Sequence, residues 1–257
     1  MTANLEFYEA FASEYRDFYD LPAAREAVEA WSAILRKADL WPPEPITLLD
    51  MGCGPGTHLA AWANEVDRVD GLDGSPAMLG AARKSLVAAG LSGVGLYCAD
   101  VTETEALTPI AGGYDIVAAH FNFLNLFDRG SLDRVAQSLR MLLKPEGIFI
   151  CDILLWDDSL EQRGERVFQE EYRGSLWSPL GVHFDASIRT IRRDWARDGE
   201  GFSETLHLHS LTDLDARLGR VGLEPRLLQE LPHPILATGE HGELELDRRL
   251  AVFAKAA

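Results

Sequence analysis

Apolar and polar positions change in regular blocks over residues 46–153, and the lengths of the blocks separate strands from helices. Short apolar runs bounded by glycine, proline or polar residues predict strands at 46–51, 67–72, 94–98, 114–119 and 147–153. Longer helical segments lie between these runs, and Ser75-Pro76 has the capping serine and first-position proline of a helix start. Strands and helices that alternate in this manner predict a parallel sheet with right-handed crossovers.

Residues 5–40, before the first strand, have helical periodicity with a break at Pro22. One side of the first helix carries an aromatic stripe, which comprises Phe7, Tyr8, Phe11, Tyr15, Phe18 and Tyr19. Such a stripe can pack as core, or it can cover a bound ligand, because tyrosine joins an apolar ring to a hydroxyl that can hold a polar group. We expect residues 1–40 to form a helical lid.

Beyond about residue 154 the pattern changes to loose alternation broken by glycine-bearing turns. This pattern predicts an antiparallel cap at 156–210, inserted after strand five, with Tyr172, Trp177 and His183 as candidates for lining a pocket. A helix that ends at Val221 and a hairpin made of 223–231 and 250–254 then return to the main sheet. The main domain is therefore expected to span 41–155 and 211–257.

Composition narrows the class of partner. The formal net charge of the 257 residues is −17, which argues against nucleic acid as a partner, because binding to a polyanion depends on Lys and Arg. No apolar run approaches the roughly 18 residues that span a bilayer, and the N-terminus lacks the basic and apolar regions of a signal peptide. The three widely spaced cysteines suggest neither a disulfide framework nor a metal site. We expect a cytoplasmic protein that acts on a small molecule, without a membrane or a nucleic acid partner.

The turn after the first predicted strand has the chemistry of a nucleotide site. Gly52, Gly54 and Gly56 allow positive φ angles and the close approach of a ligand, and the helix that follows presents backbone N–H groups. Asp73 ends the second strand, where an acidic side chain reaches a ribose diol in doubly wound sheets. The spacing is G-x-G-x-G and differs from the G-x-G-x-x-G of dinucleotide sites.

Three segments carry a resemblance to one family. Leu49-Asp-Met-Gly-Cys-Gly-Pro-Gly-Thr57 resembles motif I of class I S-adenosylmethionine-dependent methyltransferases, and Asp73-Gly-Ser-Pro-Ala-Met78 resembles their second motif. Phe11-Ala-Ser-Glu-Tyr-Arg-Asp-Phe-Tyr19 is similar to the N-terminal segment of amino-sugar N-methyltransferases and of glycine N-methyltransferase relatives. The resemblance implies an α/β fold, with a Rossmann-like seven-stranded methyltransferase sheet, an N-terminal helical lid and an antiparallel insertion after strand five.

The resemblance also implies a set of site residues. Those expected to bind the cofactor are Tyr15, Tyr19, Asp50, Gly52, Cys53, Gly54, Asp73, Gly74, Met78, Asp100, Val101, His120 and Phe121. In the family Asp100 would accept a hydrogen bond from the adenine amino group, and Tyr15 and Tyr19 would lie near the methyl group. His120, Tyr19 and Asn125 are the expected catalytic residues, with His120 as a candidate general base. In amino-sugar enzymes a histidine often stands at the position of Asn125, so a family-wide base is not assured here.

The function implied is methyl transfer from S-adenosylmethionine to a small-molecule acceptor, with S-adenosylhomocysteine as product. N-methylation is slightly favoured over O- or C-methylation, and secondary metabolism is a fitting context. The sulfonium already activates the methyl group, so the protein mainly aligns a nucleophile and excludes water. The insertion could also form a homodimer interface. Two alternatives remain, namely a methyltransferase fold that catalyses a non-methylating reaction such as cyclisation, and a nucleotide-sensing or scaffold subunit without turnover.

Overall fold

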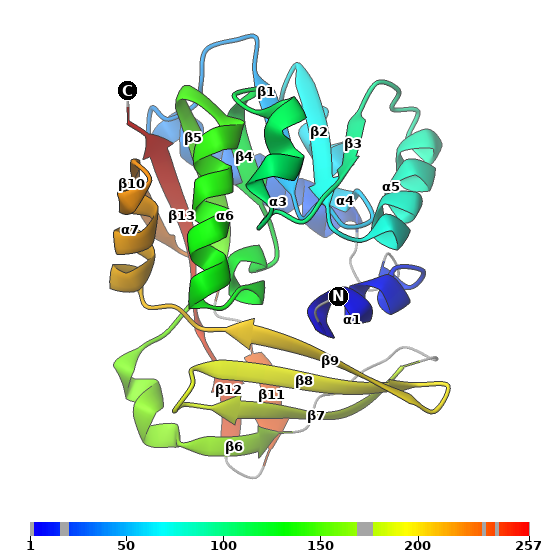
Figure 1. Ribbon diagram of the computed structural model, residues 1–257, viewed down its shortest axis with the longest axis vertical. Coiled ribbons are helices and arrows are strands. Elements are labelled where there is room, and N and C mark those ends of the chain that lie inside the picture. Colours follow the sequence, from blue (N-terminus) through cyan, green and yellow to red (C-terminus); the bar gives the residue numbers. More distant parts are fainter. Residues whose placement is uncertain (1–2, 16–20, 169–176, 233–234, 240–241, 257) are drawn as a thin grey trace.

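The computed structural model describes residues 3–15, 21–168, 177–232, 235–239 and 242–256. Figure 1 shows a large sheet covered by helices and a smaller antiparallel sheet beneath it in the view, with the N-terminal helix between the two. The larger part carries the predicted parallel sheet, and the smaller part is the predicted cap.

The large sheet has seven strands in the order β10-β13-β5-β4-β1-β2-β3. Its strands are β1 (Thr47–Met51), β2 (Arg68–Asp73), β3 (Gly95–Cys98), β4 (Tyr114–Ala119), β5 (Leu143–Leu155), β10 (Leu223–Glu230) and β13 (Asp247–Lys255). The first five pair in parallel, whereas β13 runs antiparallel to both β5 and β10. The five predicted strands and the closing hairpin are confirmed, although β5 starts four residues earlier than the predicted 147.

Helices cover both faces of this sheet, and each face has its own apolar core. One face is covered by α3 (Leu21–Lys37), α4 (Thr57–Trp62) and α5 (Pro76–Ala88), and the other by η1 (Thr104–Ile110), α6 (Arg129–Leu142) and α7 (Leu211–Arg220). The buried stripes follow helical spacing, as in α6, where Leu132, Val135, Ala136 and Leu139 face the sheet. Pro22 lies in the first turn of α3, where its missing N–H would have no helical partner in any case.

The cap is a four-stranded antiparallel sheet in the order β6-β7-β8-β9. After the short helix η3 (Asp158–Arg163), its strands are β6 (Glu165–Phe168), β7 (Ser178–Asp185), β8 (Thr190–Arg197) and β9 (Glu200–His207). A second excursion of the chain adds the hairpin β11 (Ile235–Gly239) and β12 (Gly242–Glu245), whose Leu244, with the following Leu246, joins the core of the cap. Sequence patterns did not predict this hairpin, because its strands are short and lie between the two long runs that form β10 and β13.

The helix α1 (Ala3–Phe11) packs between the two parts, against β9 of the cap and α5 of the main domain. Phe7 and Phe11 of its aromatic stripe are buried against Trp177 and Trp195 of the cap. Part of the stripe is therefore core, as one of the two readings of the sequence expected. Tyr19 and Tyr172 lie outside the described residues.

Candidate active site

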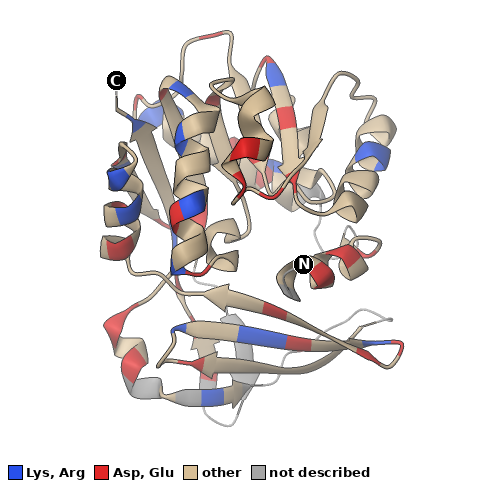
Figure 2. Ribbon diagram, viewed as in Figure 1, with Lys and Arg blue, Asp and Glu red and all other residues tan. Residues whose placement is uncertain are grey.

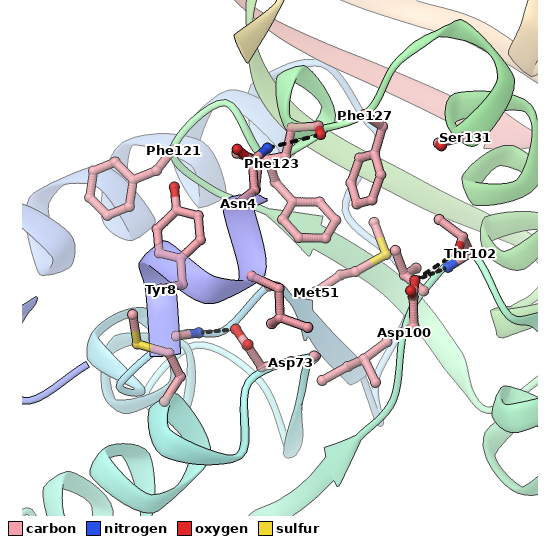
Figure 3. Close-up of a pocket in the computed structure, with 18 of the residues that line it drawn as sticks. Asn4, Tyr8, Met51, Asp73, Asp100, Thr102, Phe121, Phe123, Phe127 and Ser131 are labelled. Carbon is pink, nitrogen blue, oxygen red and sulfur yellow. Dashed lines mark hydrogen bonds between the residues drawn. The ribbon is translucent and has the colours of Figure 1, made fainter. Parts of the chain in front are cut away.

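The carboxyl ends of β1 to β4, together with α1 and the end of β9, enclose a cavity of about 600 Å³. Figure 3 shows this cavity with Asp73 near its centre, Tyr8 and Phe121 toward one end, and Asp100, Thr102 and Ser131 toward the other. Ten of the predicted cofactor residues line it, namely Tyr15, Gly52, Gly54, Asp73, Gly74, Met78, Asp100, Val101, His120 and Phe121. An open α/β sheet is expected to bind its ligand at this edge.

The glycine turn after β1 needs glycine on two separate grounds. Gly52, Gly54 and Gly56 have φ angles of 76°, 51° and 81°, in the left-handed region that side chains rarely adopt. A Cβ atom on Gly52 would also lie 2.3 Å from a ring carbon of Phe123, whereas one on Gly54 would meet nothing within 4 Å. The turn therefore brings bare backbone to the cavity wall, with Phe123 packed directly on it.

Asp73 occupies the end of β2, as predicted. One carboxylate oxygen accepts from the backbone N–H of Gly54 at 2.8 Å, and the other accepts from that of Ser75 at 2.8 Å. Burial raises the pKa of Asp73 to about 6 in spite of these two bonds. Each oxygen keeps a further lone pair, so the carboxylate is oriented for the hydroxyl groups of a ribose.

Asp50 lies behind the glycine turn and not on the cavity wall. Its side chain is 1% exposed, and neither carboxylate oxygen has a hydrogen-bond partner among the described residues. Burial, followed by the charge of Asp73, raises the pKa of Asp50 to about 8. An unpartnered buried carboxylate is costly, and a cation bound at the turn would offset that cost. Cys53 is also buried behind the turn, in the core on the α3 side of the sheet.

The other end of the cavity is formed by the end of β3 and the start of α6. Asp100 accepts from both the backbone N–H and the hydroxyl of Thr102, each at 2.8 Å, which fixes its carboxylate at the rim. Val101 supplies apolar surface, and Arg134 of α6 adds a cation. This end therefore combines a carboxylate with apolar walls, as an adenine ring requires.

His120 follows β4 and is almost fully buried in the wall. Its imidazole stacks between Trp31 and His58, and its Nε2 accepts a hydrogen bond from the indole Nε1 of Trp62 at 2.9 Å. Burial holds the pKa of His120 well below its usual value, with smaller contributions from His58 and Arg248. The ring is neutral and its Nε2 lone pair is engaged, so this geometry argues against the general-base role expected from the sequence.

Asn125 lies close to the cavity but braces the fold. It is fully buried, its amide donates to the carbonyls of Leu154 and His207 at 2.9 and 2.8 Å, and its carbonyl accepts from the N–H of Leu154 at 2.9 Å. The loop after β4, which includes η2 (Phe123–Leu126), is thereby tied to β5 and to the end of β9. The structure corrects the catalytic expectation for Asn125, because its polar atoms serve backbone groups and it does not line the cavity.

The cover of the cavity comes from α1 and β9. The hydroxyl of Tyr8 is hydrogen-bonded to Glu204, which is 2% exposed and also pairs with Arg193. The amide of Asn4 donates to the carbonyl of Thr205 at 2.9 Å and accepts from its N–H at 2.7 Å, as a neighbouring strand would. Sequence reading missed these pairs, because each joins residues about two hundred positions apart.

Residues 48–147 match the model of the methyltransferase domain family. The fold resembles an S-adenosylmethionine-dependent methyltransferase from Clostridium acetobutylicum ATCC 824, with 16% identity, 98% of both chains covered and a TM-score of 0.69. It also resembles the CcbJ methyltransferase from Streptomyces caelestis, with 21% identity, 96% of both chains covered and a TM-score of 0.68. For CalS10, an amino pentose methyltransferase from Micromonospora echinaspora, identity is 21%, coverage 96% of this chain and 97% of that one, and the TM-score 0.64. No curated protein sequence matches the chain.

The seven-stranded sheet, the glycine turn and the carboxylates at the ends of β2 and β3 are the arrangement of an α/β fold that binds nucleotides at the carboxyl ends of its strands. With the methyltransferase domain match at 48–147, the fold is that of class I S-adenosylmethionine-dependent methyltransferases, and it supports an enzyme that uses S-adenosylmethionine as its cofactor. None of the helices that the structure describes is long and apolar enough to cross a membrane.

Proposed function

We propose that this enzyme methylates a small-molecule acceptor, with an amine nitrogen favoured over oxygen or carbon. The observation that carries the proposal is the cover: α1 and β9 close over the same 600 Å³ cavity that contains the cofactor residues. An acceptor that enters this space beside the cofactor must be small. The net charge of −17 supports the exclusion of nucleic acid, and Figure 2 shows the Lys and Arg positions scattered over several elements.

In this proposal, different residues of the cavity hold different parts of the cofactor. Asp73 would hold the diol of the ribose, Met78 and the end of β3 would contact the adenine, and the glycine turn, with Asp50 behind it, would hold the methionine part. Bound S-adenosylmethionine supplies a methyl group on a positively charged sulfur, which a lone pair can attack directly. Buried Asp50 stabilises the positive charge, and the aromatic cover excludes water.

The choice of nitrogen rests on the engaged state of His120. A neutral amine attacks without a base, whereas an alcohol benefits from one. The Nε2 of His120 accepts from Trp62, so this imidazole is poorly placed to take a proton. CalS10, which the fold resembles, is an amino pentose methyltransferase, and this is consistent with an amine acceptor.

The test is turnover with a panel of small amines, alcohols and activated carbon acids. We expect S-adenosylhomocysteine to form only when an acceptor is present, together with a product that is heavier by one CH₂ group. Product formation without consumption of the cofactor would instead indicate a non-methylating enzyme. Tight cofactor binding without turnover on any acceptor would favour a sensing or scaffold subunit.

We also propose that the insertion forms a homodimer interface. Leu180 and Ile188 of the cap are 64% and 65% exposed and offer apolar surface that a second copy of the chain could cover. Sedimentation analysis of the wild type and of a variant with both residues changed to Ser tests this proposal. A monomeric wild type would exclude it.

A further inference from the structure

Both faces and one nitrogen of the His120 imidazole are occupied by other side chains. Trp31 stacks at 4.0 Å between ring centroids with an interplanar angle of 14°, and His58 stacks on the other face at 3.8 Å and 7°. Trp62 donates its indole N–H to Nε2. His120 lines the cavity, and Nδ1 is the ring nitrogen that these contacts leave for a ligand.

The bond from Trp62 fixes which nitrogen of His120 carries the proton. An indole N–H can donate but cannot accept, so the Nε2 that faces it must present a lone pair. A neutral imidazole has one protonated nitrogen, and in His120 that nitrogen is then Nδ1. The ring nitrogen of His120 that remains for a ligand is therefore an N–H donor and carries no lone pair.

The surroundings of His120 oppose a second proton on the ring. His58 of α4 stacks on it, and Arg248 of β13 adds a positive charge that is paired with Asp152 of β5. The helix α3 contributes Trp31, whose ring face shields the imidazole from water. His58 is itself buried, and burial lowers its pKa to about 4. Both imidazoles are therefore neutral near pH 7.

We propose that Trp62 is a positioning residue that fixes His120 as the Nδ1–H tautomer, and that His120 assists methyl transfer by donating a hydrogen bond to a ligand oxygen. The second half of this inference rests on the proposed function. The oxygen belongs either to the carboxylate of the cofactor or to a carbonyl, carboxylate or hydroxyl group of the methyl acceptor. In both cases the residue that the sequence suggests as a base acts as a donor.

Nitrogen-15 NMR of the imidazoles in the ligand-free protein tests the tautomer without any turnover. His120→Asn identifies the His120 signals by their loss. We expect a protonated Nδ1 and an unprotonated Nε2 that do not change between pH 5 and 8. A proton on Nε2, or a titration of His120 in this range, would overturn the inference even if methyl transfer is later demonstrated.

A pair of substitutions separates a donor from a base. His120→Asn keeps an N–H donor near the position of Nδ1 but cannot act as a base, and His120→Leu removes both functions. We expect His120→Asn to keep kcat/KM within about tenfold of the wild type and His120→Leu to lose roughly tenfold more, because a ligand oxygen is left without its donor. Equal losses in both variants would contradict the donor role.

Two further measurements locate the oxygen and test the positioning residue. Weaker binding of S-adenosylmethionine to His120→Leu assigns the oxygen to the cofactor, whereas a raised acceptor KM with unchanged cofactor binding assigns it to the acceptor. In Trp62→Phe we expect mixed tautomers and a new ionisation between pH 5 and 8 in the kcat/KM profile. An unchanged tautomer in a folded Trp62→Phe variant would exclude Trp62 as the residue that fixes it. If that variant does not fold, the NMR of the wild type decides.

Discussion

The cofactor wall and the cover of the cavity are held together by contacts of different range. In the wall, which is made by the turns after β1 to β4, Asp73 bonds to residues 2 and 19 positions away. In the cover, which is made by α1 and β9, Tyr8 meets Glu204 across 196 positions and Asn4 meets Thr205 across 201. The wall thus depends on local turns, whereas the cover depends on the docking of two distant segments.

This difference in contact range limits how the cover of the cavity can open. The sequence predicts that residues 1–40 form a helical lid, yet Arg197 of β8 donates to the carbonyl of Ala10 at 2.6 Å and pairs with Glu14. Together with the Tyr8 and Asn4 bonds, these contacts tie α1 to the cap at several points. Opening for cofactor entry must therefore move α1 and β9 together or break these bonds.

The largest expected effect on the cover comes from removing the Glu204 carboxylate, which bonds to both Tyr8 and Arg193. We expect Glu204→Ala to lower the free energy of unfolding by about 3–5 kcal/mol, because a largely buried ion pair is left with one member. Cofactor affinity should change by less than tenfold. Chemical denaturation and calorimetry measure the two quantities.

Glu200→Ala is the matched control for this change, since Glu200 is exposed on the same strand. Its effect should stay within about 0.5 kcal/mol. A Glu204→Ala protein as stable as this control would show that α1 and the cap are held together mainly by the aromatic contacts of Phe7 and Phe11.

The second prediction concerns the wall and compares two glycines with positive φ. We expect Gly52→Ala to destabilise the ligand-free protein by about 2–5 kcal/mol, from a left-handed backbone and from overlap with Phe123. Gly54→Ala should lose only the backbone part, about 1–2 kcal/mol. Thermal unfolding of both variants measures the difference.

A double mutant separates the two causes. If overlap with Phe123 matters, Phe123→Ala should recover part of the loss in Gly52→Ala, with a coupling energy of about 0.5–3 kcal/mol. Additive effects would mean that the ring of Phe123 moves aside without cost and that backbone strain alone requires glycine at position 52.

The contrast in range also explains how much of the site could be predicted. Gly52, Asp73 and Asp100 line the cavity, and their positions follow from strand, turn and helix signals within a few residues. The location of His120 followed from the rule that ligands bind at the carboxyl ends of strands. Its chemistry did not, because Trp31 and Trp62 come from helices whose packing on the imidazole leaves no mark in the local sequence.

The same limit applies to the cover and the cap. Asn4 lies in a short helix, and its side-chain amide bonds to the backbone of Thr205 at the free edge of β9. No sequence pattern near position 4 predicts this contact. The position of the hairpin β11–β12 also depends on a distant contact, because Leu244 and Leu246 pack into the core of the cap. Sequence patterns encode the alternation of elements well and their docking partners poorly.

The third prediction tests the wall through Asp73. Asp73→Ala should weaken S-adenosylmethionine binding by about 1.5–3 kcal/mol, the value of a hydrogen bond to a charged group. Calorimetry measures the affinity, and circular dichroism checks that the turn stays folded after Gly54 and Ser75 lose their acceptor. Asp100→Ala, at the exposed rim, should cost less. Unchanged affinity in Asp73→Ala would place the ribose elsewhere.

The last and smallest effect concerns the proton on Asp50. The pKa of about 8 means that this buried carboxyl is mostly protonated at pH 7 in the ligand-free protein. A positively charged cofactor lowers that pKa, so binding at pH 7 should release close to one proton. Affinity should then rise with pH by up to tenfold per unit, about 1.4 kcal/mol, and level off above pH 8.

Calorimetry in buffers with different ionisation enthalpies measures the released proton directly. Asp50→Asn keeps the shape of the side chain but has no proton to release, so its binding heat should not depend on the buffer. Its affinity should also lose the rise between pH 6 and 8, although Asp73, with a pKa of about 6, still titrates at the acidic end. Equal buffer dependence in both proteins would mean that the proton comes from another group. In that case the cation of the cofactor does not act on Asp50, and the glycine turn binds its ligand through the backbone and Asp73 alone.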